Sequence, residues 1–189
     1  MSLTEVDWSA LPKPVDDGAA DHLAGRAFPD AALVASDGST VSLAALPGVS
    51  VIYVYPMTGR PDQPLPDGWD MIPGARGCTP QSCAFRDHFK DLQDLGVAHL
   101  FGVSTQTSAY QAEAAARLHL PFPLLSDHDH AFGDALRLPS FDVAGVRLLK
   151  RLTLIADAGV IRQVHYPVFP PDQDAARVMA WLQAYRAGA

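Results

Sequence analysis

Cys78 and Cys83, the chain's two cysteines, lie five positions apart between Gly77 and Asp87. Thr79 can act as a helix N-cap, and Pro80 suits the first helical position because its missing N–H would have no intrahelical partner there. Apolar residues follow at helical spacing (Phe85, Phe89, Leu92, Leu95). Cys78 is therefore expected at a helix N-terminus, where free N–H groups and the helix dipole stabilise a thiolate, the reactive form of cysteine. The segment predicts redox chemistry.

Composition limits the classes of function. The 189 residues are 48% apolar, which suits one domain, and the net charge is -7 without a basic run. Nucleic acid and anionic membrane surfaces are therefore not expected partners. The longest apolar run is too short to span a membrane, and the N-terminus lacks a basic segment followed by an apolar one. These features predict a cytoplasmic protein, in which two close cysteines more often serve catalysis or redox sensing than a structural disulfide.

Hydrophobic patterning predicts the elements that must position the cysteines. Residues 31–43 read as a hairpin around Asp37-Gly38, and residues 49–55 as a central strand that is apolar on both faces. Further strands are expected at 97–104, 122–126, 150–156 and 160–165, and helices at 108–119, 132–138 and 172–186. Strands that alternate with helices and end in a hairpin plus a helix predict an α/β fold, a central mixed sheet flanked by helices.

Two segments fall outside this alternation in the single domain expected over residues 1–189. Residues 1–30 are rich in Pro, Asp and Ala and read as an N-terminal arm, which Trp8 either docks or leaves frayed. Residues 57–76 contain several Pro and Gly residues and lead directly into Cys78. A loop this long in a compact domain is usually functional or mobile, so it can wall or gate the thiol. Trp69 and Met71 are expected to anchor it by packing.

The pattern resembles the peroxiredoxins of the thioredoxin fold, most closely the Q-type, which is also called bacterioferritin-comigratory-protein-like. The resemblance covers about residues 25–185, with its motifs in the family's order. The matching residues are Tyr55-Pro56, Gly77-Cys78-Thr79 with Cys83, Phe85-Arg86-Asp87, Gly102-Val103-Ser104, Leu124-Leu125-Ser126-Asp127, and Arg151-x-Thr153-Leu154-Ile155-Ala156-Asp157-x-Gly159.

The resemblance implies a thiol-dependent peroxidase. Cys78 would be the peroxidatic cysteine, which attacks the peroxide and becomes a sulfenic acid, and Cys83 the resolving cysteine, which condenses with it to a disulfide. A thioredoxin-like donor would reduce that disulfide, without cofactor or metal, in a monomer or homodimer. Arg151 would face the thiolate and the peroxide, a role that suits arginine because its guanidinium stays charged and offers several donors. An ordinary surface charge is the alternative for Arg151.

The chain departs from the family pattern at one position. The family's P-x-x-x-T/S-x-x-C motif places a hydroxyl residue three positions before the cysteine, where this chain has Ala75. We interpret residues 57–76 as an insertion inside the motif, so that Pro56 would wall the site and Thr58 would hydrogen-bond the peroxide if the loop folds back. Otherwise Arg76 or a backbone N–H would serve instead.

The cysteine spacing has a mechanical consequence. If the helix extends back through Cys78, residues five apart are turned by about 140° and their Cα atoms lie roughly 8–9 Å apart. A disulfide without backbone movement needs Cα atoms within about 7 Å. The first turns of the helix are therefore expected to unwind before Cys83 can reach Cys78.

Two alternatives remain at this point. A redox sensor or disulfide carrier without efficient peroxidase turnover would have the same cysteines, and the missing hydroxyl at Ala75 keeps this possibility open. A copper-handling protein of the same fold would use two cysteines and a late histidine, for which His165 is the candidate, but such proteins typically have a C-x3-C spacing. Asp127-His128-Asp129-His130 also resembles a metal cluster, although an Asp before a helix is first of all an N-cap.

Overall fold

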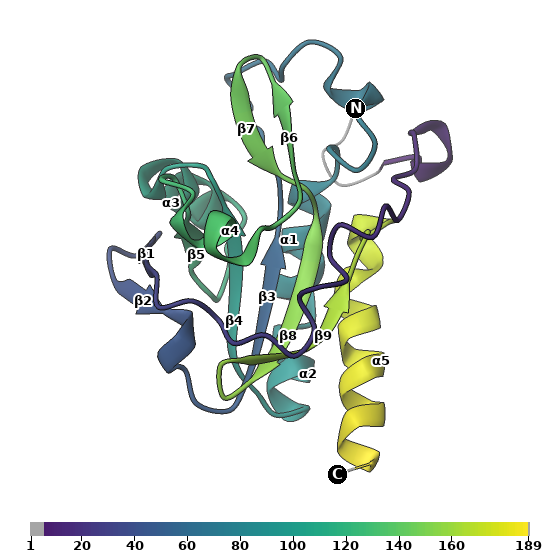
Figure 1. Ribbon diagram of the computed structural model, residues 1–189. Helices are drawn as coiled ribbons and strands as arrows, with labels where there is room; N and C mark the ends of the chain where they lie inside the picture. The colour runs from purple at the N-terminus through teal and green to yellow at the C-terminus, as the bar shows by residue number, and fades with distance from the viewer. Residues whose placement is uncertain (1–5, 189) are drawn as a thin grey trace.

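The computed structural model describes residues 6–188 as a central sheet of seven strands, in the order β2-β1-β5-β4-β3-β8-β9, with helices packed on it (Figure 1). The strands are β1 (Ala32–Ala35), β2 (Thr40–Ser42), β3 (Val49–Val54), β4 (Val97–Ser104), β5 (Leu124–Ser126), β8 (Leu152–Asp157) and β9 (Val160–His165). The helices are α1 (Cys78–Asp87), α2 (Phe89–Asp94), α3 (Ser108–Arg117), α4 (Ala131–Leu136) and α5 (Asp174–Ala187). A separate hairpin pairs β6 (Ser140–Val143) with β7 (Val146–Leu149), and the short 3-10 helices are η1 (Trp8–Ala10), η2 (Leu43–Ala45), η3 (Trp69–Met71) and η4 (Pro171–Gln173).

The sheet is mixed, as the sequence predicted. β4 runs parallel to β3 and β5, whereas β8 is antiparallel to β3 and β9. β3 lies between β4 and β8, and its residues from Ser50 onward are buried, which explains why both of its faces are apolar. One face of β3 packs against α1, α2 and α5, and the other against α4 and the segment around Leu23 and Phe28.

The expected strands and helices are present, with corrections at the cysteine helix. Thr79 is not the N-cap: the cap is Gly77, and α1 begins at Cys78. Pro80 is still accommodated because the N–H groups of the first helical turn need no intrahelical partner. The apolar stripe from Phe85 to Leu95 is divided between two helices, α1 and α2, with the break at His88.

The insertion, residues 57–76, lies beside the β6–β7 hairpin at the top of Figure 1. Trp69 is buried there against Phe141, with ring centroids 6.3 Å apart, so it is the packing anchor that was expected. The same expectation for Met71 is wrong, because its side chain is 73% exposed. The hairpin itself had not been anticipated.

The N-terminal arm crosses the front of the sheet in Figure 1. Its first five residues lie outside the described part of the chain. Asp17 ties the arm to the body through Lys150 Nζ at 2.7 Å and the Tyr166 hydroxyl at 2.8 Å. Within residues 6–188, no helix combines the length and the apolar character that a membrane crossing requires.

Candidate active site

Cys78 is the first residue of α1 and is only 3% exposed. The first intrahelical bond runs from the Gln81 N–H to the Gly77 carbonyl. Pro80 has no N–H, so the N–H groups of Cys78 and Thr79 are the ones at this end without an intrahelical partner. A helix N-terminus with free N–H groups favours a negative charge beside it. The location expected for Cys78 at the start of the helix is confirmed.

The cap residue Gly77 is tightly enclosed. Its φ of +110° disfavours any residue with a side chain, and an added Cβ would lie 2.6 Å from Pro171 and 2.8 Å from the Trp8 ring. Trp8 is held in turn by a hydrogen bond of 2.8 Å from its ring N–H to the Asp172 carboxylate. Of the two interpretations of Trp8, docking is therefore the one observed, and it covers the helix end that carries Cys78.

Arg151 lies behind the thiol, 3% exposed, at the residue before β8. Its Nη2 is 3.2 Å from the Cys78 Sγ and also donates to the carbonyl oxygens of Gly74, Ala75 and Arg76, at 3.0–3.3 Å. Its Nη1 donates to the Gln81 side-chain oxygen. The guanidinium therefore joins the end of the insertion to α1 and brings a positive charge to Cys78, so the surface-charge interpretation of Arg151 is excluded by its burial.

At the position of the missing hydroxyl, Ala75 offers only its backbone as a hydrogen-bonding group. Ala75 is fully buried, and its carbonyl oxygen accepts from Arg151 and lies 3.6 Å from the Cys78 Sγ. The side chain of Arg76 lines the pocket over the thiol and is held by both oxygens of Asp70 at 2.7 Å. Arg76, Cys78 and Thr79 all line the pocket over the thiol, so these residues offer hydrogen-bond donors there.

The pocket over Cys78 measures about 60 Å³. Most of its wall comes from the insertion and the start of α1, and its lining residues are Val6, Met57, Gly59, Leu65, Trp69, Arg76, Gly77, Cys78, Thr79 and Pro80. Met57, Leu65 and Trp69 make one side apolar, opposite the polar helix end. The insertion therefore walls the thiol, one of the two roles expected for it.

Pro56 and Thr58 do not line this pocket. Pro56 is buried two residues after the end of β3. Thr58 is also fully buried: its hydroxyl donates to the Gln106 side-chain oxygen at 3.1 Å, and its carbonyl accepts from the Tyr110 hydroxyl at 3.0 Å. The structure thus brings Cys78, Arg151 and Arg76 together, and it leaves the roles of Pro56 and Thr58 as predictions.

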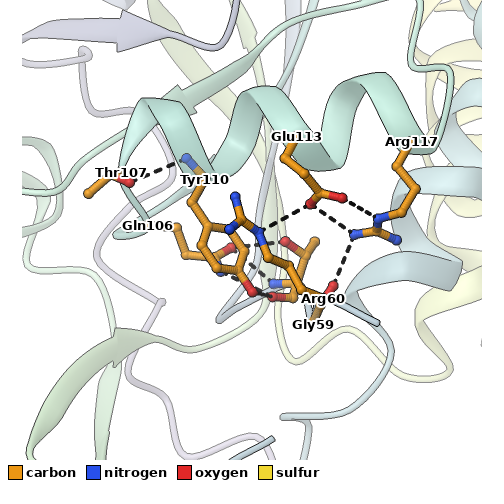
Figure 2. Close-up of polar contacts among 8 residues, drawn as sticks. Gly59, Arg60, Gln106, Thr107, Tyr110, Glu113 and Arg117 are labelled. Carbon is orange, nitrogen blue, oxygen red and sulfur yellow. Dashed lines mark hydrogen bonds and ion pairs between the residues drawn. The ribbon is translucent and has the colours of Figure 1, made fainter. Parts of the chain in front are cut away.

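The same contacts fasten the start of the insertion to α3 (Figure 2). Arg60 lies over the Tyr110 ring, 4.1 Å from its centroid, and its Nε is 3.4 Å from Glu113. Glu113 also pairs with Arg117 at 2.7 Å, and Arg117 donates to the Gly59 carbonyl at 3.0 Å. This set, Thr58–Arg60 on Gln106, Tyr110, Glu113 and Arg117, is called the α3 latch below.

Cys83 lies on the next turns of the same unbroken helix, 8% exposed, and both cysteines are free thiols. Burial raises the pKa of the Cys83 thiol, and the nearby Arg86 guanidinium opposes that shift. Because α1 includes Cys78, the condition for the unwinding argument is met: the two side chains are turned about 140° apart on an intact helix. The unwinding itself stays a prediction.

Two buried residues of the site were missed by the sequence reasoning. Gln81 contacts Arg151, and Asp174 accepts from Gln81 at 2.8 Å. Gln81 had a readable signal, because a residue three positions after Cys78 lies on the same helix face. Asp174 had no such signal, because the helix dipole by itself favours an Asp at a helix start.

The histidines weighed as metal ligands have other neighbours. Asp127 caps α4, accepting from the N–H groups of Phe132 and Gly133 at 2.9 Å each, while burial raises its pKa. The His165 Nδ1 lies 3.8 Å from the Asp174 carboxylate. Within the described residues, no three His, Cys, Asp or Glu side chains are grouped so that they could hold a metal ion.

A thiol at a helix N-terminus, held by a buried arginine in a thioredoxin-like fold, defines a class of thiol redox protein. Comparison with known proteins gives the family: residues 23–179 match the Redoxin family model, and the chain belongs to this family, in its peroxiredoxin Q group. Peroxiredoxin Q, chloroplastic, of Oryza sativa subsp. japonica is 31% identical over 85% of this chain and 66% of its own length. The chain thus spans about two thirds of the length of such curated relatives.

Solved structures agree. Peroxidoxin BcpB from Mycobacterium tuberculosis superposes with a TM-score of 0.69 at 25% identity, covering 85% of this chain and 96% of that one. The bacterioferritin comigratory protein of Xanthomonas campestris, whose structures concern alkyl peroxide reduction, gives 0.67 at 25% identity over 84% and 96%. The thioredoxin-like fold implied by the sequence resemblance is confirmed.

Proposed function

We propose that this chain is a thiol-dependent peroxidase that reduces hydrogen peroxide and organic hydroperoxides with Cys78. The observation that carries the proposal is the contact of 3.2 Å between the Cys78 Sγ and the Arg151 Nη2 at the N-terminus of α1. The cation and the free N–H groups favour the thiolate, and they also stabilise the negative charge that develops on the leaving oxygen. Membership of the peroxiredoxin Q group supports the same chemistry.

The reaction has two covalent steps in the chain. The Cys78 thiolate attacks one peroxide oxygen, the O–O bond breaks, and Cys78 becomes a sulfenic acid while the other oxygen leaves as an alkoxide or hydroxide and takes up a proton. The Cys83 thiolate then attacks the sulfenic sulfur, and a disulfide forms with loss of water. A thioredoxin-like dithiol would return both cysteines to thiols and become oxidised itself.

The pocket supports a small substrate. A volume of about 60 Å³ suits hydrogen peroxide or a short organic hydroperoxide, and the apolar side at Met57, Leu65 and Trp69 suits an alkyl group. We assign the hydrogen bond that the family's hydroxyl would make to Arg76 and to the N–H groups of Cys78 and Thr79. To reach the peroxide, Thr58 would first have to break its hydrogen bond with Gln106. Pro56 would support the start of the insertion.

The setting of the enzyme is also part of the proposal. We also propose a thioredoxin-like reductant and a monomer or homodimer. A cytoplasmic location fits the two thiols and the net charge of -7. The curated plant relatives are chloroplastic by name, so fractionation of cells that express the natural protein is the test of location. Sedimentation of the reduced and oxidised protein tests the oligomeric state.

Stopped-flow oxidation by hydrogen peroxide tests the central claim on wild type, Cys78→Ser and Cys83→Ser. Rapid oxidation of wild type and Cys83→Ser, lost in Cys78→Ser, is the expected result. Oxidation of all three no faster than a free thiol would contradict the peroxidase. The sensor or carrier function would then be preferred, and turnover with a thioredoxin system, measured on the same samples, separates the two.

A further inference from the structure

A fully buried carboxylate lies behind the site and has no part in the chemistry described so far. Asp174, the first residue of α5, accepts hydrogen bonds on Oδ2 from the Thr153 hydroxyl at 2.6 Å and from the Gln81 amide at 2.8 Å. The His165 Nδ1 lies 3.8 Å from the other carboxylate oxygen, Oδ1. Burying a carboxylate is unfavourable unless charge or hydrogen bonds compensate, so this one calls for a function.

Gln81 connects that carboxylate to Arg151. The side chain is fully buried, with its Nε2 on Asp174 and its Oε1 on the Arg151 Nη1. A glutamine amide has one end that donates and one that accepts, whereas arginine only donates and a carboxylate only accepts. With both neighbours present, the amide therefore has a single orientation, its oxygen toward Arg151.

The fold brings these groups to one face of the sheet. Arg151 and Thr153 are two residues apart at the start of β8, so their side chains point to the same face. Helix α1, which carries Gln81, and helix α5, which begins at Asp174, both pack on that face. The chain of contacts from Asp174 to Cys78 thus crosses three elements that are far apart in the sequence.

We propose that Asp174 is a positioning residue for Cys78, acting through Gln81 and Arg151. Asp174 fixes the Gln81 amide, the amide oxygen holds the Arg151 Nη1, and the Nη2 is thereby kept at 3.2 Å from the Cys78 Sγ. The amide spacer matters for the charge. A carboxylate bonded directly to the guanidinium would compete with the thiolate for its N–H groups, whereas one amide away it supplies a counter-charge and leaves the Nη2 edge to sulfur. The inference rests on the proposed function.

A double-mutant cycle tests this path. We expect Asp174→Ala and Gln81→Leu each to slow oxidation of Cys78 by hydrogen peroxide about tenfold, the size of one hydrogen bond to a charged group. The double variant should be no slower than the slower single variant, because both changes break the same path. If the two losses multiply, or if Asp174→Ala reacts as fast as wild type, the proposal is overturned.

Two matched variants separate positioning from stability. In Asp174→Asn the side-chain oxygen can still accept from both donors, so we expect a rate within about threefold of wild type, a rescue relative to Asp174→Ala. Thr153→Val removes a buried hydrogen bond of the same carboxylate but leaves the Gln81 contact, so it should lower the melting temperature and spare the rate. If Thr153→Val slowed the reaction as much as Asp174→Ala does, the effect would be a general structural one and the proposal would be overturned.

A readout without peroxide keeps the inference separate from the proposed function. The ¹⁵N NMR signals of the Arg151 Nη groups should show hindered rotation in wild type and Asp174→Asn, and faster rotation in Asp174→Ala and Gln81→Leu. If wild type fails to react with peroxide but these spectra change as expected, positioning stands and the peroxidase fails. Unchanged spectra in Asp174→Ala would overturn positioning whatever the activity.

Discussion

Two walls of different construction enclose Cys78. The rear wall consists of Arg151, Gln81 and Asp174, all at most 3% exposed and connected by hydrogen bonds to the sheet and two helices. The front wall is the insertion, residues 57–76, which Trp69 anchors against the β6–β7 hairpin and the partly exposed α3 latch fastens at its start.

This difference separates the groups that contact the Cys78 sulfur, in the rear wall, from the loop over it, in the front wall. The groups that must be positioned beside the Cys78 sulfur to within a few tenths of an ångström lie on buried elements, where their neighbours fix them. Much of the pocket wall over the thiol lies on a loop, where partly exposed contacts that are each worth little hold the conformation. We therefore expect rear-wall changes to alter the reaction strongly and front-wall changes to alter mainly loop dynamics and substrate preference.

The largest effect is expected at Arg151. Arg151→Ala removes the cation beside Cys78 and leaves the carbonyls of Gly74, Ala75 and Arg76 without their donor. We expect the rate of oxidation by hydrogen peroxide to fall on the order of 10²–10³-fold. Stopped-flow fluorescence measures it. Arg162→Ala, an exposed arginine on β9, is the matched control and should react like wild type; equal rates in the two variants would refute the rear-wall account.

Gly77 connects the insertion to α1, and its replacement should lower the stability of the fold. Gly77→Ala imposes a Cβ at φ +110° and a clash with Pro171 and Trp8, so we expect the free energy of unfolding to fall by about 1–3 kcal/mol. Gly38→Ala is the control, since Gly38 has φ +86° but open space around its Cβ. Denaturant titration of both variants isolates the clash, and an equal loss in the two would show that only backbone strain matters.

The second chemical step should depend on pH through Cys83. Burial raises the pKa of this thiol, so at neutral pH it is mostly protonated, and the rate of disulfide formation should rise as the pH rises toward that pKa. Arg86→Ala removes a charge that lowers the pKa and should slow the step several-fold at a given pH. Lys90→Ala removes an exposed positive charge and serves as control. A pH-independent disulfide step in wild type would contradict this role of Cys83.

The smallest effect is expected at the α3 latch. Glu113→Ala breaks the pairs with Arg60 and Arg117, which are partly exposed, so it should lower the free energy of unfolding by about 0.2–1 kcal/mol. Hydrogen exchange of residues 57–68 should become faster, with the rate toward hydrogen peroxide within about twofold of wild type. Asp94→Ala, which breaks the Lys90 pair on α2, should leave that exchange unchanged; unchanged exchange in Glu113→Ala as well would show that the latch does not hold the insertion.

Local patterns predicted most elements of the fold. The apolar run at β3, the Asp37-Gly38 turn and the spacing of α3 and α5 were read correctly, because each depends on neighbours in the sequence. The β6–β7 hairpin was missed. No residue of β6 is buried, and the hairpin packs on the insertion, a contact between segments about 70 residues apart.

The candidate site also contains residues that local patterns predicted and residues that depend on tertiary contacts. Cys78 at a helix start, and the pattern around Arg151, were readable because residue type and spacing carry the chemistry. The location of Thr58 has a tertiary cause: Gln106 and Tyr110 bind its hydroxyl and carbonyl, and Arg76 and Leu65 of the same loop line the pocket over Cys78.

By itself, then, the sequence determined that Cys78 lies at a helix start, most of the strands and helices of a mixed sheet, and the family resemblance. Tertiary structure alone decided what surrounds the thiol: Arg151 on the Ala75 carbonyl, Trp8 over the helix end, and Asp174 on Gln81. The physical reason is that a thiolate's environment is set by charges and donors within a few ångströms. Here Trp8, Arg151 and Asp174 come from parts of the chain that are far from Cys78 in the sequence, and no local pattern encodes their proximity.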